Sequence, residues 1–417
     1  MGMMYNHLRT LFAALSILAL SACAGTSRPV AEVAAEARAP VTILISIDGL
    51  RPDYLDRGVS PNINALAASG VKASMRPSFP SLTFPNHHSL VTGLRPDRHG
   101  IVDNTMIDAR RPDVRFTLGD PRQSLDPFWW DEAEPIWVTA EKAGIRTGTM
   151  FWPGSEVAIH GARPQDWLRY DKAVSGTQRI NTVLDWMRRP AAIRPRFVTL
   201  YFDTVDTVGH ELGPDAPETT AAFAEVDRLI GELISGLKVI GQSANILLVS
   251  DHGMGATADD RVIRIDRMIA PDVGMIVTEG PLSGVNALPG KDAEVAATLL
   301  APHEHMQCWR KSALPAHFAY GKNPRVPEFL CLAARGWAIQ ARDREHILKG
   351  MHGYDPAEPD MAAVFIAAGP AIASGAALPV FDNVDVYPLL ARLVGIAPVS
   401  NVDGRAETLN PLLRAAN

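Results

Sequence analysis

Cysteine, clusters of positive charge and internal repeats are all scarce in this chain of 417 residues. It has three cysteines, so a metal site built from thiolates is not expected. Lysine and arginine form no run and the net charge is -6 at pH 7, which argues against electrostatic binding of nucleic acid polymers but permits small nucleotides. Because no repeat and no linker-like break follow residue 40, one α/β unit with a lid subdomain is expected.

The amino terminus has the composition of an export signal. Residues 1–10 carry Arg9, residues 11–20 are mostly apolar, and the tetrapeptide Leu-Ser-Ala-Cys ends at Cys23. An apolar run this short does not cross a bilayer, which takes about 20 residues, so residues 1–22 are expected to be a signal peptide. The tetrapeptide resembles a bacterial lipobox, which implies a lipid anchor on Cys23, a tether over residues 23–40, and a periplasmic location at the outer membrane. Secretion without a lipid is the alternative.

Carboxylates and histidines adjoin several apolar runs that are typical of buried strands. They are Asp48 after residues 41–47, Asp206 and His210 after 196–202, Asp251 and His252 after 245–250, and His352 before 361–367. Parallel strands end at one edge of a sheet, where open α/β sheets bind ligands, so these side chains are expected to share one crevice. A capping aspartate beside a solvated histidine in a loop is the alternative.

Three aspartates and three histidines exceed the needs of one zinc ion, whose catalytic sites usually take three protein ligands. Two metal ions fit better. A carboxylate and imidazole set without thiolate favours zinc, with manganese or iron as poorer fits. A pair of ions about 3.5 to 4 Å apart is suited to in-line phosphoryl displacement.

A nucleophile for that displacement is found upstream, at Thr83. Pro85 suits the first turn of a helix, so Thr83 is expected at the helix entrance, where free amides favour an anion. Asn104 offers an amide donor for a phosphoryl oxygen. The alternatives are that Thr83 or Ser81 is only a helix cap and that Asn104 is an ordinary turn residue.

Taken together, these segments make the chain resemble the nucleotide pyrophosphatase/phosphodiesterase family of the alkaline phosphatase superfamily. The resemblance runs from about residue 41 to about residue 401 and rests on the motifs ISIDGLRPDYL, FPSLTFPNHHSLVTGLRPDRHGIVDN, FWPGSEVAIHGARP, DTVDTVGHELGP, SDHGM and KGMHGYD. It implies an α/β fold, a three-layer sandwich with a central, mostly parallel sheet. The catalytic domain would cover residues 41–417, with an inserted lid segment at about 256–350.

The same resemblance implies a role for each candidate. One zinc would be bound by Asp206, His210 and His352, and the second by Asp48, Thr83, Asp251 and His252. Asn104 and the amide of Thr83 would hold the phosphoryl oxygen while Thr83 attacks phosphorus, giving a covalent phosphothreonine intermediate that water hydrolyses. Asp203 has no assigned metal role.

Substrate recognition is expected to use aromatic side chains. In the family, aromatic residues at the positions of Phe84 and Tyr201 sandwich a nucleobase. In this chain Tyr170 is expected to add a contact. Packing in the core is the alternative for each ring. The segment between Arg76 and Arg95 holds no further cation to meet the extra charge of a monoester, so diesters are favoured.

The sequence therefore predicts hydrolysis of nucleoside 5'-phosphodiesters, dinucleotides and nucleoside triphosphates to 5'-monophosphates. A phosphodiesterase for phospholipid or choline-phosphate head groups is the alternative within the fold, and Trp309 and Trp337 keep it open. A catalytically silent envelope protein is the alternative from another class. Apart from Cys23, the even pair Cys308 and Cys331 in an oxidising compartment predicts a disulfide, with free buried cysteines as the alternative.

Overall fold

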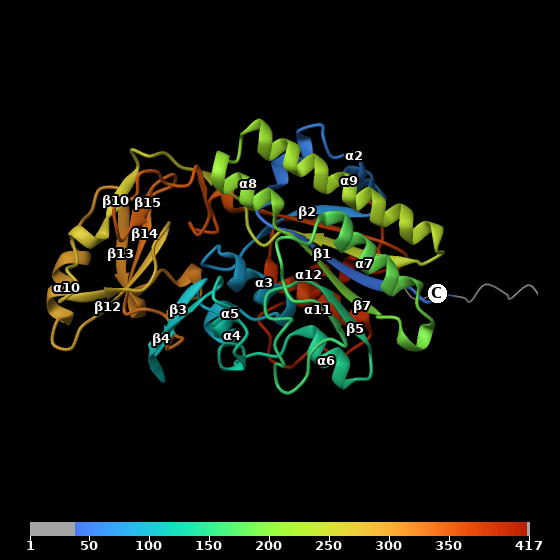
Figure 1. The fold of residues 1–417 in the computed structure, drawn as a ribbon, viewed down its shortest axis with the longest axis horizontal. Coiled ribbons are helices and arrows are strands. Elements are labelled where there is room, and N and C mark those ends of the chain that lie inside the picture. Colours follow the sequence, from blue (N-terminus) through green and yellow to red (C-terminus); the bar gives the residue numbers. More distant parts are fainter. Residues whose placement is uncertain (1–37, 415–417) are drawn as a thin grey trace, which may run out of the picture. The chain divides into compact units, whose positions relative to one another are not determined.

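A central eight-stranded sheet organises the computed structural model, which describes residues 38–414 (Figure 1). β17 runs antiparallel to both of its neighbours, and the other paired strands run parallel, so the predicted mostly parallel sheet is confirmed. In spatial order the strands are β18 (Phe381–Asp382), β2 (Val71–Arg76), β17 (Ala363–Ala368), β8 (Ala244–Val249), β1 (Val41–Ile47), β7 (Phe197–Phe202), β5 (Thr147–Met150) and β6 (Asp166–Trp167).

The central strands are apolar because both faces of the sheet are covered. Every residue of β1 is buried, and successive side chains alternate between the two faces. Ile43 and Ile45 pack into the core on one face, and Leu44 packs into the core on the other. Helices on both faces complete the three-layer sandwich that the sequence predicts (Figure 1).

Each layer of helices contributes an apolar stripe to its own core. On one face the core includes side chains from α2 (Pro61–Ser69), α7 (Gly176–Arg188) and α9 (Pro217–Val239). On the other it includes α3 (Thr83–Thr92), α6 (Ile136–Lys142), α11 (Val386–Val394) and α12 (Ala406–Leu409). Proline begins α2 and α9, where its missing N–H costs nothing.

Residues between β8 and β17 form a separate set of small sheets with a core of their own. One four-stranded sheet has the order β11 (Gly274–Ile276), β12 (Leu282–Ala287), β14 (Phe329–Ala333) and β13 (Met306–Arg310), and α10 (Asp292–Leu299) packs against it. Two-stranded sheets pair β9 (Gly255–Ala256) with β16 (Gly350–Met351), and β10 (Val262–Arg264) with β15 (Ala338–Gln340). Cys308 and Cys331 pair across β13 and β14 and form a disulfide, which confirms the predicted bridge.

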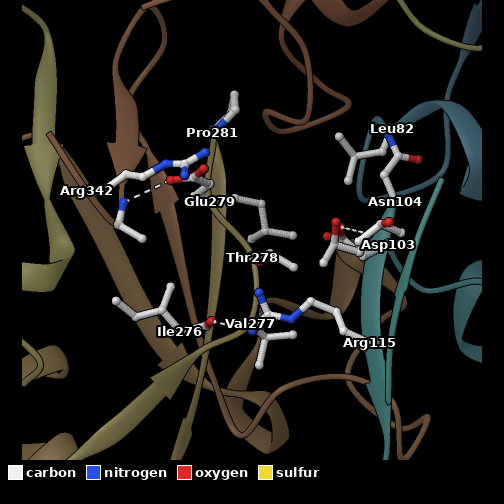
Figure 2. Close-up of a pocket in the computed structure, with 14 residues that line it drawn as sticks. Leu82, Asp103, Asn104, Arg115, Ile276, Val277, Thr278, Glu279, Pro281 and Arg342 are labelled. Atoms are coloured by element: carbon white, nitrogen blue, oxygen red, sulfur yellow. Dashed lines mark hydrogen bonds between the residues drawn. The ribbon is translucent and has the colours of Figure 1, made fainter. Parts of the chain in front are cut away.

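A hairpin of β3 (Thr105–Asp108) and β4 (Arg111–Thr117) faces this inserted set of sheets. Between the hairpin and the β11–β12 connection lies a cavity of about 440 Å³ (Figure 2). Three further helices are α4 (Pro96–His99), α5 (Pro121–Ser124) and α8 (Thr204–Leu212).

The predicted signal peptide, Cys23 and residues 23–37 of the predicted tether lie outside the described residues. Within residues 38–414, no helix combines the length and apolar character needed to span a membrane.

Candidate active site and metal centre

Two neighbouring strands bring the first group of candidate ligands together. β1 and β8 pair in parallel, so Asp48 after β1 and Asp251 after β8 leave the same edge of the sheet. His252 Nε2 lies 3.0 Å from Asp251 Oδ2 and 3.5 Å from Asp48 Oδ1. All three side chains are buried. We call Asp48, Asp251 and His252 the strand-end cluster.

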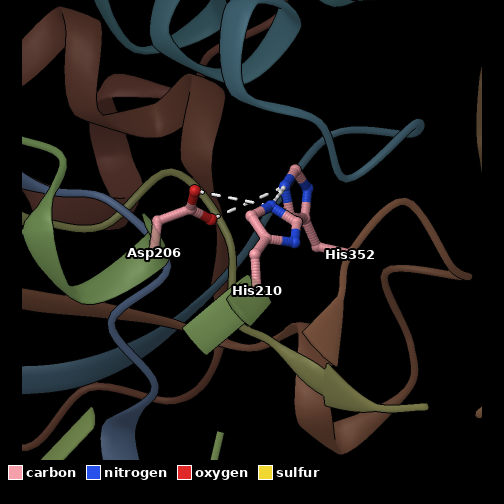
Figure 3. A group of neighbouring side chains, drawn as sticks. All are labelled: Asp206, His210 and His352. Carbon is pink, nitrogen blue, oxygen red and sulfur yellow. Dashed lines mark hydrogen bonds and ion pairs between the residues drawn. The ribbon is translucent and has the colours of Figure 1, made fainter. Parts of the chain in front are cut away.

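Helix α8 and the residue after strand β16 supply the second group. Asp206 and His210 lie four residues apart on α8, hence on one face of that helix. His352 follows β16, and its Nε2 lies 3.6 Å from Asp206 Oδ1 (Figure 3). His210 Nε2 lies 3.4 Å from Asp206 Oδ2. We call Asp206, His210 and His352 the helix cluster. The imidazole ring of His352 stacks on that of His252 in the strand-end cluster, with 3.5 Å between the ring centroids.

All three histidines present the same nitrogen to the clusters. Nδ1 of His252 lies 2.9 Å from the carbonyl of Gly253, and Nδ1 of His210 lies 2.7 Å from that of Gly350. Nδ1 of His352 likewise lies 2.8 Å from the carbonyl of Ser81. Because a carbonyl only accepts hydrogen bonds, each Nδ1 carries the proton and each Nε2 lone pair faces the clusters. This is how metal-bound histidines are held in proteins.

One oxygen of each carboxylate in the two clusters lacks a hydrogen-bond partner. Oδ1 of Asp48, Oδ1 of Asp206 and Oδ2 of Asp251 are buried without a hydrogen-bond partner. Burial and the nearby charge of Asp251 raise the pKa of Asp48 well above its ordinary value. Burial also raises the pKa of Asp206. Each raised pKa means that the protein alone stabilises the carboxylate poorly as an anion. Carboxylate oxygens and imidazole nitrogens converge here, and this donor set fits divalent cations such as zinc.

The sequence-predicted nucleophile lies beside the strand-end cluster. Thr83 is the first residue of α3, and its Oγ1 lies 3.2 Å from Nε2 of His252. Its backbone N–H is among the free donors at the start of a helix. Oδ1 of Asn104 accepts a hydrogen bond from the N–H of Phe84 at 2.9 Å, which fixes the Asn104 amide next to Thr83. The predicted amide donors and hydroxyl are thus brought together.

The three predicted aromatic residues differ in exposure. Phe84 is half-buried and packs against Phe116 and Trp130. Tyr170 is 37% exposed, whereas Tyr201 is 8% exposed and its hydroxyl donates to Asp48 Oδ2 at 2.6 Å. The burial of Tyr201 favours a role in holding Asp48 rather than in stacking on a base. Tyr170 is the more accessible of the two tyrosine rings.

Sequence reasoning missed a residue beneath the strand-end cluster. His87 lies one helical turn after Thr83 on α3, is fully buried, and places Nδ1 3.3 Å from Asp251 Oδ2. Its Nε2 lies 2.8 Å from the hydroxyl of Ser46, which fixes the ring. The available signal was the spacing of four residues from Thr83, which puts both on one helix face.

Asp203, to which no metal role was assigned, has partners of its own. Its carboxylate accepts hydrogen bonds from Arg179 and from the hydroxyl of Tyr170, both at 2.9 Å. Arg179 and Tyr170 lower the pKa of Asp203 although its burial raises it. Asp203 is therefore a paired carboxylate outside both clusters.

Comparison with known proteins agrees with this geometry. The family model for type I phosphodiesterase/nucleotide pyrophosphatase matches residues 42–355. An uncharacterized pyrophosphatase/phosphodiesterase of Schizosaccharomyces pombe is 36% identical over 395 residues, which cover 90% of this chain and 81% of the relative. The bis(5'-adenosyl)-triphosphatase enpp4 of Xenopus laevis is 37% identical over 367 residues, covering 87% of this chain and 79% of that protein.

Solved structures show the same fold. Human ectonucleotide pyrophosphatase/phosphodiesterase 5 has a TM-score of 0.86 and 32% sequence identity, covering 90% of this chain and 100% of its own. An inactive threonine-to-alanine variant of the murine protein, in complex with AMP, has a TM-score of 0.86 and 31% identity over the same shares. The predicted family and its class of hydrolase are confirmed: the chain belongs to the type I phosphodiesterase/nucleotide pyrophosphatase family of the alkaline phosphatase superfamily.

Proposed function

We propose that the protein hydrolyses phosphodiester and phosphoanhydride bonds of nucleotides to release nucleoside 5'-monophosphates, with Thr83 as nucleophile and two zinc ions as cofactors. The observation that carries this proposal is the convergence of three imidazole lone pairs and three unpartnered carboxylate oxygens beside the Thr83 hydroxyl. The triphosphatase name of the Xenopus relative and the AMP complex of the murine one support a nucleotide substrate.

The two clusters divide the ligands between the ions. The helix cluster would hold one zinc, and the strand-end cluster together with Thr83 would hold the other. Manganese or iron would suit the same donors less well. When bound, the two cations supply charge stabilisation and lower the pKa of a coordinated hydroxyl.

The residues of the chain account for the rest of the reaction. Thr83 Oγ1 loses its proton to water and attacks phosphorus. The bond from phosphorus to the leaving oxygen breaks, the leaving group departs as an anion or with a proton from water, and a phosphate ester of Thr83 forms. The Thr83 N–H and the Asn104 side-chain amide donate to a phosphoryl oxygen, and the start of α3 adds its dipole. Water then hydrolyses the ester from the vacated side. Two inversions at phosphorus give overall retention. The inactive threonine-to-alanine murine variant agrees with a threonine nucleophile.

We assign the nucleobase to the exposed surfaces of Phe84 and Tyr170. Base stacking on an aromatic ring contributes about 1 to 3 kcal/mol and tolerates different bases. Tyr201, which the resemblance pairs with Phe84, is instead assigned to Asp48 because its ring is buried and its hydroxyl is committed.

Export of the protein agrees with the names of the human and murine relatives, which are called ectonucleotide pyrophosphatases, that is, enzymes outside the cell. The lipid anchor on Cys23 and an outer-membrane location in a periplasm stay predictions, because they rest on the amino-terminal sequence alone.

The choline-phosphate alternative gains no support from the tryptophans that kept it open. Neither Trp309 nor Trp337 lines the cavity beside Asn104; that cavity carries Arg115 and Arg342 instead. Guanidinium groups would repel a quaternary amine. The intact hydroxyl of Thr83 disfavours a catalytically silent protein.

Three ester substrates test the proposal. Purified protein is assayed with p-nitrophenyl thymidine 5'-monophosphate, p-nitrophenyl phosphorylcholine and p-nitrophenyl phosphate, with and without a chelator. We expect the nucleotide diester to be preferred at least about tenfold, or roughly 1.4 kcal/mol in transition-state binding. Chelation and Thr83→Val, which keeps the shape of the side chain without the hydroxyl, should each abolish turnover, and Thr83→Ser should retain part of it. A preference for the choline ester would reject the proposal.

A further inference from the structure

The cavity of about 440 Å³ adjoins the site without containing any candidate metal ligand from either cluster. One wall is the β3–β4 hairpin, and the other is formed by the β11–β12 connection and the residues after β15. Leu82, which precedes Thr83, and Asn104 both line it. Its volume lies within the usual range of small-ligand sites.

Strand β4 separates this cavity from the ring of Phe84, to which the nucleobase is assigned. Phe116 points to one side of the strand, where its ring lies 6.0 Å from that of Phe84. Arg115 points to the other side, into the cavity (Figure 2), and Thr117 also lines the cavity. Successive side chains of a strand face opposite ways, so a base stacked on Phe84 and a group in the cavity would lie on opposite sides of β4.

The cavity also borders the helix cluster. Gly353, next to His352, has φ of 112°, and a Cβ atom there would lie 3.0 Å from Leu82 and 3.7 Å from Pro281. Leu82 and Pro281 both line the cavity. A phosphoryl group at Thr83 would therefore have the ring of Phe84 on one side. The cavity, next to His352, would lie on the other side.

Unpaired positive charge faces the cavity from both walls. Arg115 and Arg342 are exposed, and neither forms an ion pair with a carboxylate among residues 38–414. Arg115 donates to the carbonyl of Ile276 at 3.1 Å, which leaves further donors free. Glu279 is already engaged by Arg344 and by the N–H of Ala341.

A second carboxyl in the lining carries less than a full charge. Burial raises the pKa of Asp103 to about 7. The cavity is therefore net positive near neutral pH. Phosphate groups match guanidinium groups well, because two N–H donors of one planar guanidinium can bind two oxygens of one phosphate.

We propose that this cavity binds an anionic, phosphate-bearing leaving group, such as pyrophosphate or the second nucleotide of a dinucleoside polyphosphate. The inference rests on the proposed function and adds the residues that would hold the leaving group of that reaction. Arg115 and Arg342 favour nucleoside polyphosphates over diesters that release an uncharged alcohol or a phenol.

The proposed leaving-group site is tested with two substrates that transfer the same thymidine 5'-monophosphoryl group but release different leaving groups. The kcat/KM values for thymidine 5'-triphosphate and p-nitrophenyl thymidine 5'-monophosphate are measured at fixed metal and ionic strength, and their ratio is compared between proteins. We expect the ratio to fall at least about tenfold in the Arg115→Gln/Arg342→Gln double variant, because charge-assisted contacts to phosphate are lost. Arg115→Lys should recover part of the ratio. Added salt should lower the wild-type ratio, since these charges are exposed.

Arg122→Gln is the matched control, because Arg122 is exposed, pairs with Asp120 and lies outside the cavity lining. Its ratio should equal that of the wild type. If the double variant keeps the wild-type ratio, or loses both activities equally, the cavity does not bind the leaving group although the proposed function stands. If the wild-type protein hydrolyses neither thymidine substrate, the proposed function fails and this inference fails with it.

Discussion

Replacing Tyr201 with phenylalanine tests whether this ring holds a metal ligand or a nucleobase. The change removes one hydroxyl and keeps the ring, so any stacking would survive. The lost contact is a buried hydrogen bond of 2.6 Å to Asp48 Oδ2. Hydrogen bonds to charged groups contribute about 1.5 to 3 kcal/mol, and outer-shell partners of metal ligands typically alter affinity by about 10- to 100-fold. We therefore expect zinc affinity to fall by roughly that factor.

The assay titrates activity against free zinc in chelator-buffered solution and compares midpoints. Tyr170→Phe is the matched control: it also removes one tyrosine hydroxyl, but that hydroxyl donates to Asp203, outside both clusters. Its zinc midpoint should equal that of the wild type. If Tyr201→Phe keeps the wild-type midpoint, the assigned role of Tyr201 is wrong. At saturating zinc the KM for the nucleotide should stay at the wild-type value, because the ring is kept.

Three further changes probe other parts of the structure. Arg325→Met should lower the free energy of unfolding in urea by about 3 to 5 kcal/mol, because Asp108 and three backbone carbonyls lose a buried partner; a loss below about 1 kcal/mol would contradict this. Phe84→Ala should raise KM for nucleotides about 5- to 100-fold in steady-state assays, with a smaller effect on p-nitrophenyl phosphate. Burial raises the pKa of Asp103 from 3.8 to about 7, so the folded state holds this proton more tightly and wild-type stability should fall as pH rises through that window. Relative to Asp103→Asn, the loss should be roughly 3 kcal/mol between pH 5 and pH 8 in urea unfolding, and parallel pH profiles would refute it.

The sequence alone was sufficient for the features that depend on neighbouring residues. Continuous apolar runs predicted the buried strands, and Asp48 and Asp251, which follow β1 and β8, leave the same edge because these strands run parallel. Pro85 two residues after Thr83 predicted the start of α3. The cysteine pair also predicted the disulfide between Cys308 and Cys331.

Tertiary structure decided which side chains are exposed and which distant segments meet. Tyr201 lies on a central strand, and only the packing around it buries the ring and directs its hydroxyl to Asp48. The cavity joins Arg115 to Arg342 across more than two hundred residues of chain, a meeting that no local pattern encodes. Local periodicity fixes the direction of a side chain within its own element, whereas the neighbours it meets depend on how the whole chain packs.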